Sequence, residues 1–261
     1  MAMIERSDTG AVARLTLNAP ERLNALSDAM MAGLLAELET LASQPHIRAV
    51  ILAGAGKAFC AGHDLKEMTA GRSAEDGGRA YFGDLFARCG DLMMAIRALP
   101  QPVIAEVHGI ATAAGCQLVA SCDMAVAADG TRFGVNGVNI GLFCSTPMVA
   151  LSRNIPRKQA FEMLTTGAFI DAARAADLGL INRAVPAGDL QQEAMELAQT
   201  VAAKLGGAVR IGKRAFYEQV EMPLEQAYLH TGEVMTQNMM FEDTAEGIAA
   251  FLGKRSPDWS Q

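Results

Sequence analysis

Apolar residues follow two different spacings along this chain. Short apolar or alternating runs predict β-strands, and apolar residues three or four positions apart predict helices. In the first two thirds of the chain, predicted strands and helices alternate. Strands are expected over residues 3–6, 12–17, 48–53, 102–108 and 124–128, and helices over 27–41, 64–68, 80–98 and within 109–123. This alternation is typical of an α/β fold with mostly parallel strands.

The rest of the chain is predicted to be mainly helical. A glycine-rich loop over residues 134–147 comes first, and no linker of distinct composition divides the chain. Helices are then expected over 147–153, 157–165, 171–178, 188–205, 208–219, 224–239 and 243–252, with one strand at 181–185. The pattern predicts one large domain, or a core with a small helical subdomain.

The stretch GIATAAGCQLVASCD, residues 109–123, is the strongest candidate for a functional element. It follows an apolar strand and joins a glycine-rich turn to the start of a helix. Small residues let the backbone approach a ligand closely, and the first N–H groups of a helix are unpaired at its positive end. This arrangement suits a ligand that develops negative charge. Gln117 lies one turn beyond Ala114, where an acid or base would be expected.

Composition narrows the class of protein. The chain has 261 residues, of which 51% are hydrophobic and 20% charged, as in a soluble globular protein. The net charge of −7 argues against a nucleic-acid partner. No segment is long and apolar enough for membrane insertion, and the first residues resemble neither a signal nor a transit peptide. These features predict a cytoplasmic protein. Five cysteines without metal-ligand spacing are expected to be reduced thiols, namely Cys60, Cys89, Cys116, Cys122 and Cys144.

A second glycine-rich turn lies at residues 56–64. Taken singly, either turn could be a binding loop or a simple connector. Together with other segments, the two turns resemble the crotonase (enoyl-CoA hydratase/isomerase) superfamily over nearly the whole chain. The segments that carry the resemblance are NAP (18–20), NAL (24–26), GKAFCAGHDLKEM (56–68), GIATAAGCQLVASCD (109–123), LTTG (164–167) and AADLGLI (175–181). Residues 62–66, 111–123 and 141–147 resemble one subgroup of that superfamily most closely.

The resemblance implies an α/β protein with the crotonase (ClpP/crotonase-like) fold, a spiral core of ββα units. Residues 1–200 would form this core with an acyl-CoA site, and residues 201–261 a carboxyl-terminal helical region for trimerisation. A homotrimer, or a homohexamer made of two trimers, is implied, with a role in fatty acid metabolism. No permanently bound cofactor is expected, because the coenzyme A thioester would be the substrate or ligand.

The resemblance also implies a binding site for the thioester. The backbone N–H groups of His63 and Ala114 would form an oxyanion hole that polarises the thioester carbonyl and stabilises an enolate. The residues expected to bind the substrate and its coenzyme A moiety are Lys57, Ala58, Ala61, His63, Asp64, Leu65, Lys66, Ala114 and Lys254, with Arg255 as an alternative to Lys254 near the phosphates.

Two positions depart from the pattern of the family hydratases, which use two glutamates to move protons. The first position is Gln117, and the family spacing places the second at Gly137. A carboxamide exchanges no proton near neutral pH and glycine has no side chain, so neither can act as a general base. Ser145 lies where some family isomerases place an aspartate, and it is a weaker candidate.

Three other side chains leave alternatives open. Asn139 would either position a ligand or stabilise a turn. Cys144 lies in the same loop without a recognisable base, which favours a buried, inert thiol. The imidazole of His63 would either take part in the chemistry or only accompany the backbone N–H of that residue.

Three functions are compatible with this combination. The first is an acyl-CoA lyase that stabilises a thioester enolate; decarboxylation of a malonyl-type thioester fits best, because loss of CO₂ creates the carbanion without a base. The second is a non-catalytic acyl-CoA-binding protein. The third is an enoyl-CoA hydratase or isomerase of low activity, in which Gln117 orients a water molecule.

Overall fold

The computed structural model describes residues 2–260. Within this range six strands form one sheet in the order β1-β2-β3-β4-β6-β9. The strands are β1 (Ile4–Thr9), β2 (Val12–Leu17), β3 (Ala49–Gly54), β4 (Val103–Val107), β6 (Met124–Ala128) and β9 (Arg183–Val185). β1 and β2 form an antiparallel hairpin, and each other neighbouring pair in this sheet is parallel. The predicted α/β class with mostly parallel strands is confirmed.

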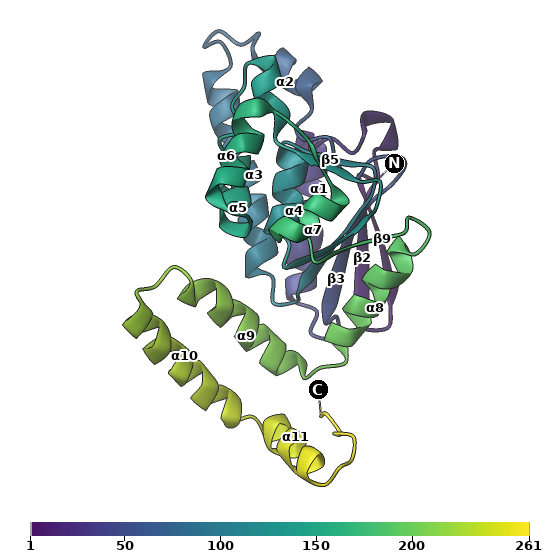
Figure 1. The fold of residues 1–261 in the computed structure, drawn as a ribbon, viewed down its shortest axis with the longest axis vertical. Helices are drawn as coiled ribbons and strands as arrows, with labels where there is room; N and C mark the ends of the chain where they lie inside the picture. Colours follow the sequence, from purple (N-terminus) through teal and green to yellow (C-terminus); the bar gives the residue numbers. More distant parts are fainter. Residues whose placement is uncertain (1, 261) are drawn as a thin grey trace.

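Helices cover both faces of this sheet (Figure 1). On one face, Val50 and Leu52 of β3 join the main core, to which α1 (Asp28–Ala42), α3 (Arg79–Ala98) and α4 (Ala114–Ser121) contribute. On the other face, Ile51 packs with Ala198 and Ala202 of α8 (Leu190–Ala202). Side chains alternate across a strand, so burial on both faces requires apolar residues at successive positions. This explains the continuous apolar runs in the sequence.

A smaller sheet turns the chain toward the candidate site. Among the described residues it contains β5 (Ile110–Thr112), β7 (Arg132–Gly134) and β8 (Ile170–Asp171), in that order. The chain leaves β4 and enters β5 through Gly109, whose φ is +64°. A Cβ at Gly109 would lie 2.1 Å from the Lys57 carbonyl oxygen. Only glycine fits this crossing, which brings β5 against the loop that follows β3.

The remaining helices surround these sheets or extend from them. They are α2 (Leu65–Gly71), α5 (Pro147–Asn154), α6 (Arg157–Thr166), α7 (Ala172–Leu178) and the 3₁₀ segments η1 (Pro20–Arg22) and η2 (Asn136–Ile140). The carboxyl-terminal arm consists of α9 (Gly206–Gln219), α10 (Leu224–Met239) and α11 (Glu242–Leu252). Figure 1 shows the arm extending from the body at the end opposite α2. The expected division into residues 1–200 and 201–261 stays a prediction.

Two features differ from the expected elements. The predicted loop over residues 134–147 contains η2, and residues 110–112 form a strand instead of belonging only to a turn. Both are short, and their hydrogen bonds reach distant parts of the chain, so periodicity alone could not reveal them. Among residues 2–260, the structure contains no helix with the length and apolar character needed to cross a membrane.

Candidate functional site

A buried asparagine fixes the loop between β3 and α2. Asn24 is fully buried, and its Nδ2 donates to the carbonyl oxygens of Ala55 and Ala58, each at 2.8 Å. Further along, the N–H of Leu26 donates to the carbonyl of Gly62 at 2.7 Å. Satisfied buried amides hold a loop in one conformation. The anchoring role of Asn24 was not predicted, although this residue belongs to one of the motifs described above.

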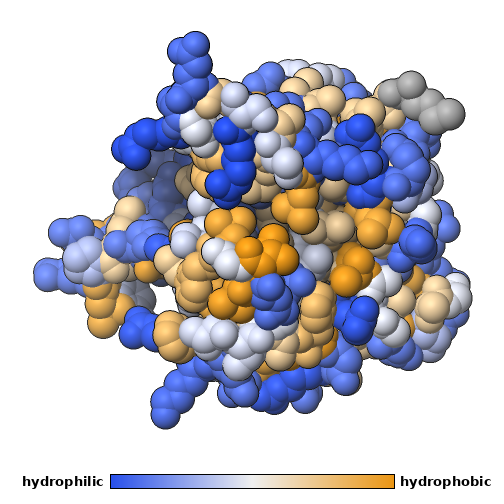
Figure 2. Space-filling view, turned by 90° about the horizontal axis from the view of Figure 1, so that it is seen from above, coloured by the Kyte–Doolittle hydropathy of each residue, from blue (hydrophilic) through white to orange (hydrophobic). Residues whose placement is uncertain are grey.

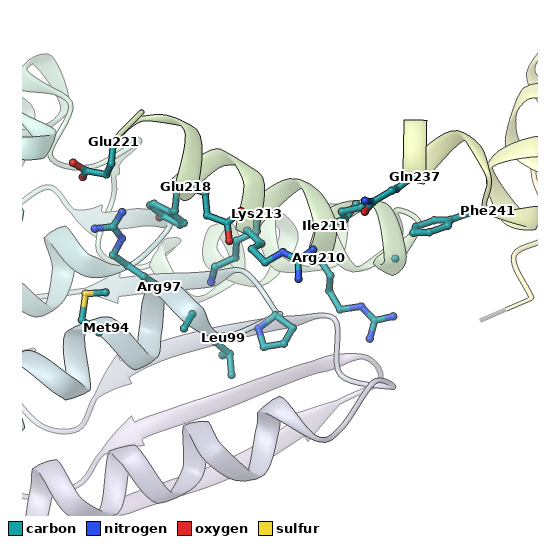
Figure 3. A pocket seen from close by; sticks show the side chains of 15 residues that line it. Met94, Arg97, Leu99, Arg210, Ile211, Lys213, Glu218, Glu221, Gln237 and Phe241 are labelled. Carbon is teal, nitrogen blue, oxygen red and sulfur yellow. The ribbon is translucent and has the colours of Figure 1, made fainter. Parts of the chain in front are cut away.

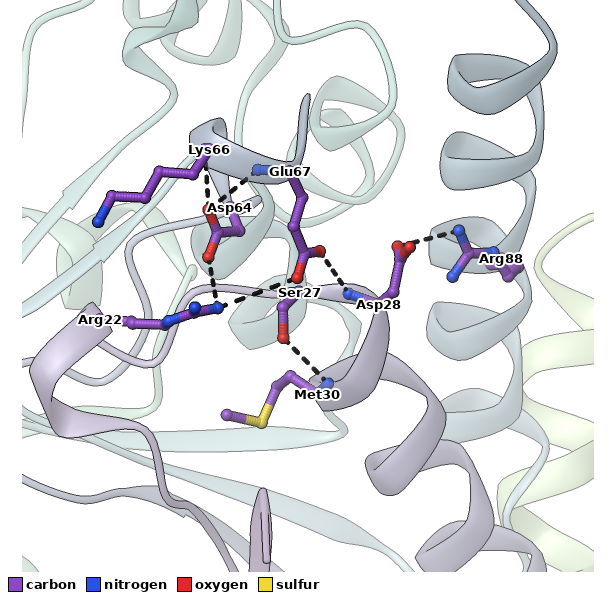
Figure 4. A network of polar contacts seen from close by, with 8 residues as sticks. All are labelled: Arg22, Ser27, Asp28, Met30, Asp64, Lys66, Glu67 and Arg88. Atoms are coloured by element: carbon purple, nitrogen blue, oxygen red, sulfur yellow. Dashed lines mark hydrogen bonds and ion pairs between the residues drawn. The ribbon is translucent and has the colours of Figure 1, made fainter. Parts of the chain in front are cut away.

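The end of the same loop is fixed by a network of charged groups (Figure 4). Asp64 is 7% exposed and caps α2 by accepting from the N–H groups of Lys66 at 2.8 Å and Glu67 at 3.3 Å. Arg22 donates to the other oxygen of Asp64 at 3.1 Å. Glu67 in turn accepts from the N–H of Asp28 at 2.8 Å. This network ties α2 to the start of α1 and restrains the peptide that precedes Asp64.

The turn before α4 has an unusual backbone conformation. Ala113 has φ 50° and ψ −120°, a region that residues other than glycine rarely adopt. Its N–H donates to the carbonyl of Gly134 at 2.9 Å. The next residue, Ala114, begins α4, so its N–H has no acceptor within the helix. A Cβ at Gly115 would lie 2.2 Å from the Cys60 carbonyl oxygen, so α4 starts in direct backbone contact with the loop after β3.

The structure brings the two predicted N–H donors into neighbouring positions. A Cβ at Gly62 would lie 3.3 Å from the backbone nitrogen of Ala114 and 3.0 Å from the carbonyl oxygen of Thr112. His63 follows Gly62 directly, so its N–H and that of Ala114 come from two facing segments. Among the described residues, neither N–H has a hydrogen-bond acceptor. Two donors on neighbouring segments are what an oxyanion hole requires, and their joint action on one oxygen atom stays a prediction.

Gln117 lies one turn into α4 and is 5% exposed. Its Oε1 is 3.9 Å from the Sγ of Cys89 on α3. Its Nε2 has no acceptor among residues 2–260. A carboxamide in this place can orient a ligand by hydrogen bonds but cannot remove a proton.

The position expected for the second glutamate is filled by other atoms. A Cβ at Gly137 would lie 2.3 Å from the Leu142 carbonyl oxygen and 2.9 Å from the Cys144 Sγ. The N–H of Leu142 donates to the Gly137 carbonyl at 3.0 Å, which closes the loop over this residue. The space for a side chain at position 137 is therefore absent in this loop conformation, and not only the side chain itself.

The imidazole of His63 is the other polar group beside the donor pair. Its ring contacts Phe86 edge-on, with ring centroids 5.8 Å apart. Both ring nitrogens are buried, and neither forms a well-aligned hydrogen bond in the described chain, although the backbone of Leu26 lies close to the ring. Burial lowers the pKa of His63, against smaller opposing effects of the Leu26 carbonyl and Asp28. The ring is therefore neutral near pH 7, with one N–H donor and one acceptor nitrogen.

The cysteines behave as buried, protonated thiols. Burial raises the pKa of Cys89 to about 11 and those of Cys60 and Cys116 to about 12, and it also raises the pKa values of Cys122 and Cys144. A thiol in this state is a poor nucleophile. The raised pKa of Cys144 agrees with the expectation of a buried, inert thiol.

The expected coenzyme A-binding residues fall into two groups. Lys57, Leu65 and Lys66 are exposed on the loop after β3 and on α2, while Ala58 and Asp64 are buried and Ala61 is half-buried. Lys254 lies just after α11, at the opposite end of the molecule from α2 (Figure 1). Within a single chain Lys254 therefore lies apart from the other residues, and its part in binding coenzyme A stays a prediction. The reason is the extended arm, which sequence spacing could not reveal.

The weaker candidates form hydrogen bonds to backbone carbonyls. Ser145 is exposed, and its hydroxyl donates to the Phe143 carbonyl at 3.4 Å. The Asn139 amide donates to the Gly167 carbonyl at 3.4 Å and joins η2 to the end of α6; both roles expected for Asn139 stay predictions. Thr112 was not predicted; its hydroxyl donates to the Asn136 side chain at 2.6 Å and joins β5 to η2.

A cavity of about 1020 Å³ lies elsewhere, between the end of α3 and the arm. Figure 3 shows Arg97, Leu99 and Arg210 among the side chains around it. None of the predicted substrate-binding residues lines this cavity. The cavity thus belongs to the junction of α3 with the arm and not to the candidate site.

Comparisons with known proteins agree with the resemblance described above. The family model for enoyl-CoA hydratase/isomerase matches residues 7–261. Human enoyl-CoA hydratase domain-containing protein 3, a mitochondrial protein, is 46% identical over 95% of this chain and 80% of its own length. A probable enoyl-CoA hydratase of Mycobacterium bovis is 35% identical over 99% of this chain and 97% of its own length.

Solved structures show the same relationship. A crystal structure of an enoyl-CoA hydratase from Mycobacterium smegmatis has a TM-score of 0.95 and 53% identity, and covers 99% of each chain. The crystal structure of human enoyl-CoA hydratase domain-containing protein 3 has a TM-score of 0.94 and 44% identity, covering 98% of this chain and 100% of that one. The crotonase fold and the resemblance to this subgroup are confirmed.

The cytoplasmic location predicted from the sequence is contradicted. The relatives named enoyl-CoA hydratase domain-containing protein 3, from human to rat, mouse and frog, are mitochondrial proteins. Location depends on targeting segments and not on the folded domain, so composition was a poor guide. The matching family model, the curated relatives and the solved structures agree on one assignment: the chain belongs to the enoyl-CoA hydratase/isomerase family.

Proposed function

We propose that this protein binds coenzyme A thioesters and stabilises their enolates with the backbone N–H groups of His63 and Ala114. Family membership supports the ligand class, because enoyl-CoA hydratases and isomerases act on such thioesters. The observation that carries the proposal is the approach of the two donors, with the Gly62 Cβ position 3.3 Å from the nitrogen of Ala114. Two fixed N–H groups stabilise negative charge on one oxygen, and losing one costs roughly 10²–10³ in rate.

The reaction that best suits this site is decarboxylation of a malonyl-type thioester. The bond between C2 and the carboxylate carbon breaks, CO₂ leaves, and the electron pair remains as a thioester enolate held by the two N–H groups. The enolate then takes one proton from solvent at C2. This sequence needs no residue to remove an α-proton, in agreement with Gln117 and Gly137 at the positions of the two glutamates. The protein would then be a lyase.

A second candidate function is binding without catalysis. The closed loop over Gly137 favours it, because the Leu142 carbonyl and the Cys144 sulfur occupy the place of a second proton carrier. Binding of acyl-CoA would remain, while hydration would be lost.

Calorimetry and product analysis separate these functions. We expect malonyl-, methylmalonyl- and butyryl-CoA to bind with micromolar Kd values, about −8 kcal/mol. Malonyl-CoA should be converted to acetyl-CoA and CO₂, which chromatography detects. Binding without any turnover would favour the second candidate. If a folded sample bound none of the thioesters, or hydrated crotonyl-CoA at an ordinary hydratase rate, the proposal would be wrong.

A matched pair of glycine variants tests the donor pair. Gly62→Ala would place a Cβ 3.0 Å from the Ala113 methyl and from the Thr112 carbonyl at a φ of +90°, which displaces the neighbouring N–H. We expect decarboxylation to fall about 10²-fold. Gly77→Ala carries similar backbone strain, with a φ of +67°, but has no atom within 4 Å of the new Cβ. Equal losses of rate in both variants would contradict a specific role of the donor pair.

We also propose that the chain assembles as a homotrimer or as a hexamer of two trimers. The arm supports this proposal, because large apolar side chains on it are open to solvent: Leu224 is 74% exposed, Tyr228 73%, Leu229 71%, Met240 78%, Phe251 83% and Leu252 75%. Apolar side chains also gather around a hollow on the face seen from above in Figure 2. Patches of this kind are typical of contacts between chains. In such an assembly, Lys254 of another copy would complete the coenzyme A site.

A further inference from the structure

A row of aromatic rings runs from His63 along the first turns of α3. The ring centroids of His63 and Phe86 are 5.8 Å apart. Those of Phe86 and Phe82 are 6.5 Å apart, with 21° between the ring planes. Phe82 and Phe86 lie one helical turn apart on the same face of α3, and both are half-buried, so part of each side chain is open to solvent. The row is an apolar surface that begins at a residue of the donor pair.

A guanidinium group lies at the far end of this row. Arg72 stacks over the Phe82 ring, with its Cζ 5.3 Å from the ring centroid. Arg72 is the C-cap residue of α2. A Cβ at the preceding Gly71 would lie 2.3 Å from the Tyr81 ring, so the end of α2 packs directly against the start of α3. The place of Arg72 beside Phe82 is therefore fixed by a close contact between two helices.

The edge of this guanidinium group is open to an anion. Stacking on a ring occupies the face of the group and leaves the N–H donors in its plane. Among residues 2–260, the Arg72 side chain forms no ion pair and no hydrogen bond, whereas Arg22 and Arg88 are each paired with an aspartate. Asp76 instead accepts from two backbone N–H groups at the start of α3. A planar fork of donors of this kind matches a carboxylate.

The order of these groups matches one kind of acyl chain. With the thioester carbonyl at the donor pair, methylene groups of the chain would contact Phe86 and then Phe82, and the end of the chain would reach Arg72. A chain that ends in a methyl group leaves the guanidinium group without a partner. A chain that ends in a carboxylate pairs with it, and a site built to hydrogen-bond one group discriminates against a ligand that lacks it.

We propose that the protein binds coenzyme A thioesters whose acyl chain ends in a carboxylate, and that Arg72 is the residue that selects for this group. The chain lies along Phe86 and Phe82, and its terminal carboxylate takes no part in the reaction at C2. This inference rests on the proposed function, because it assumes that the thioester carbonyl lies at the N–H groups of His63 and Ala114. It requires binding alone, and it holds with or without decarboxylation.

The test compares thioesters of equal chain length that differ only at the far end. Isothermal titration calorimetry measures Kd for octanoyl- and suberyl-CoA, and for the short pair butyryl- and succinyl-CoA. We expect suberyl-CoA to bind about tenfold more tightly than octanoyl-CoA, since a hydrogen bond between charged groups changes affinity on this scale. Succinyl-CoA should gain nothing over butyryl-CoA, because a short chain ends beside Phe86 and does not reach Arg72.

The outcomes separate this inference from the proposed function. Equal affinities within both pairs would overturn the inference and leave the proposed function intact. An equal advantage for succinyl-CoA and suberyl-CoA would also overturn it, because the preference would then not depend on the distance to Arg72. If a folded sample binds none of the four thioesters, the proposed function fails, and this inference fails with it.

Arg72→Met locates the recognition. The variant keeps an apolar side chain over Phe82 but removes the charge and the N–H donors. We expect the ratio of the Kd of octanoyl-CoA to that of suberyl-CoA to fall about tenfold, toward 1, while the Kd of octanoyl-CoA is unchanged. Arg72→Lys keeps the charge without the planar fork, so it should retain only part of the ratio. A ratio that stayed high in Arg72→Met would contradict the assignment.

Arg79→Met is the matched control. Arg79 is also an exposed arginine, at the start of α3, and its side chain forms no ion pair or ring contact in the described chain. Its replacement changes the net charge by the same amount, and the ratio of Kd values should stay as in the unaltered protein. Equal falls in Arg79→Met and Arg72→Met would show that overall charge decides the preference, which would overturn the role of Arg72.

Discussion

At the scale of residues, Gly137 is a position where the neighbouring atoms leave no room for a side chain. Its lack of a side chain is visible in the sequence, but the atoms that fill the space come from Leu142 and Cys144. The nearest of them belongs to the backbone, which cannot rotate away as a side chain can. Introducing a glutamate at this position therefore requires the whole loop after η2 to change path.

We predict that Gly137→Ala lowers the free energy of unfolding by about 1–3 kcal/mol, the usual range for overpacking. The added Cβ would lie 2.3 Å from the Leu142 carbonyl oxygen, so the loop must shift. Urea denaturation measures the change. Gly130→Ala is the control, because a Cβ there meets no atom within 4 Å. Similar stabilities for the two variants would show that the loop over Gly137 adapts freely.

His63 should make stability depend on pH. Its pKa in the folded protein lies below the ordinary value of 6.5 because the ring is buried. Below pH 6.5 the unfolded chain binds a proton that the folded chain does not, so stability rises with pH between the lowered pKa and 6.5. The contribution of His63 is complete above this window and is lost as pH falls through it, at no more than about 1.4 kcal/mol per pH unit.

Urea denaturation at pH 7.5 and at pH 5.5 checks this prediction, with His63→Phe as the comparison. The loss of stability between the two pH values should be smaller in the variant, which has no group to protonate at this position. Parallel losses in both proteins would mean that the imidazole is protonated as easily in the folded state as in the unfolded chain.

At the scale of elements, one buried ion pair attaches the arm to the body. Lys213 of α9 lies 2.7 Å from a carboxylate oxygen of Asp123, and its ammonium group also donates to the carbonyls of Ile96 and Gln101, each at 3.0 Å. Tyr217 donates to the other oxygen of Asp123 at 2.8 Å. Burial lowers the pKa of Lys213, and the neighbouring Asp123 opposes this effect. Asp123 also stands between α4 and β6, so the arm is attached directly beside the site helix.

We predict that Lys213→Met destabilises the folded protein by about 3 kcal/mol, because it leaves a buried carboxylate without its cation. Breaking a buried ion pair usually costs about 3–5 kcal/mol of stability. We expect the lower end of this range, since Val103 and Tyr217 still donate to Asp123. Lys204→Met, at an exposed lysine, should change stability by less than about 0.5 kcal/mol. Urea denaturation compares the two, and proteolysis should cut the arm faster in Lys213→Met alone. Indistinguishable variants would refute the role of the ion pair.

Elements with a long apolar period were predictable from the sequence. The helix expected over 80–98 is found as Arg79–Ala98, because its apolar spacing and the prolines after it are local signals. The strands of the smaller sheet were not all predicted, since strands of two or three residues carry no measurable period. Their positions depend on hydrogen bonds to remote segments, such as that from Arg132 to the Gly109 carbonyl at 3.0 Å.

The residues of the candidate site were also predictable only in part, because contacts between remote segments cannot be read from the sequence. The resemblance identified Gly62, His63 and Ala114, and the structure places these residues next to one another. The anchoring of the loop by Asn24 and the unpaired nitrogens of His63 could not be read from the sequence. Both depend on which atoms face each other after folding, and spacing along the chain contains no such information.

At the scale of the whole molecule, the exposed apolar side chains of the arm lead to a prediction about the number of chains in the assembly. We predict that sedimentation velocity finds three or six chain masses. The exchange of Phe251 and Leu252 for glutamate should lower that mass, because charged groups would disrupt a contact between copies. In a monomer these side chains, 83% and 75% exposed, would tolerate the change. A single-chain mass for the unaltered protein would contradict the proposed assembly.

The strained backbone at Ala113 has a consequence for how this sequence can evolve. A residue held at φ 50° and ψ −120° costs about 1–3 kcal/mol, and glycine would adopt the same conformation without that strain. Alanine and glycine codons differ by a single nucleotide, so one point mutation replaces the strained alanine with glycine. Under selection for stability alone, glycine would be the expected outcome at this turn. We therefore expect alanine here to be kept by selection on what the turn binds, and libraries selected only for thermal resistance to enrich Ala113→Gly.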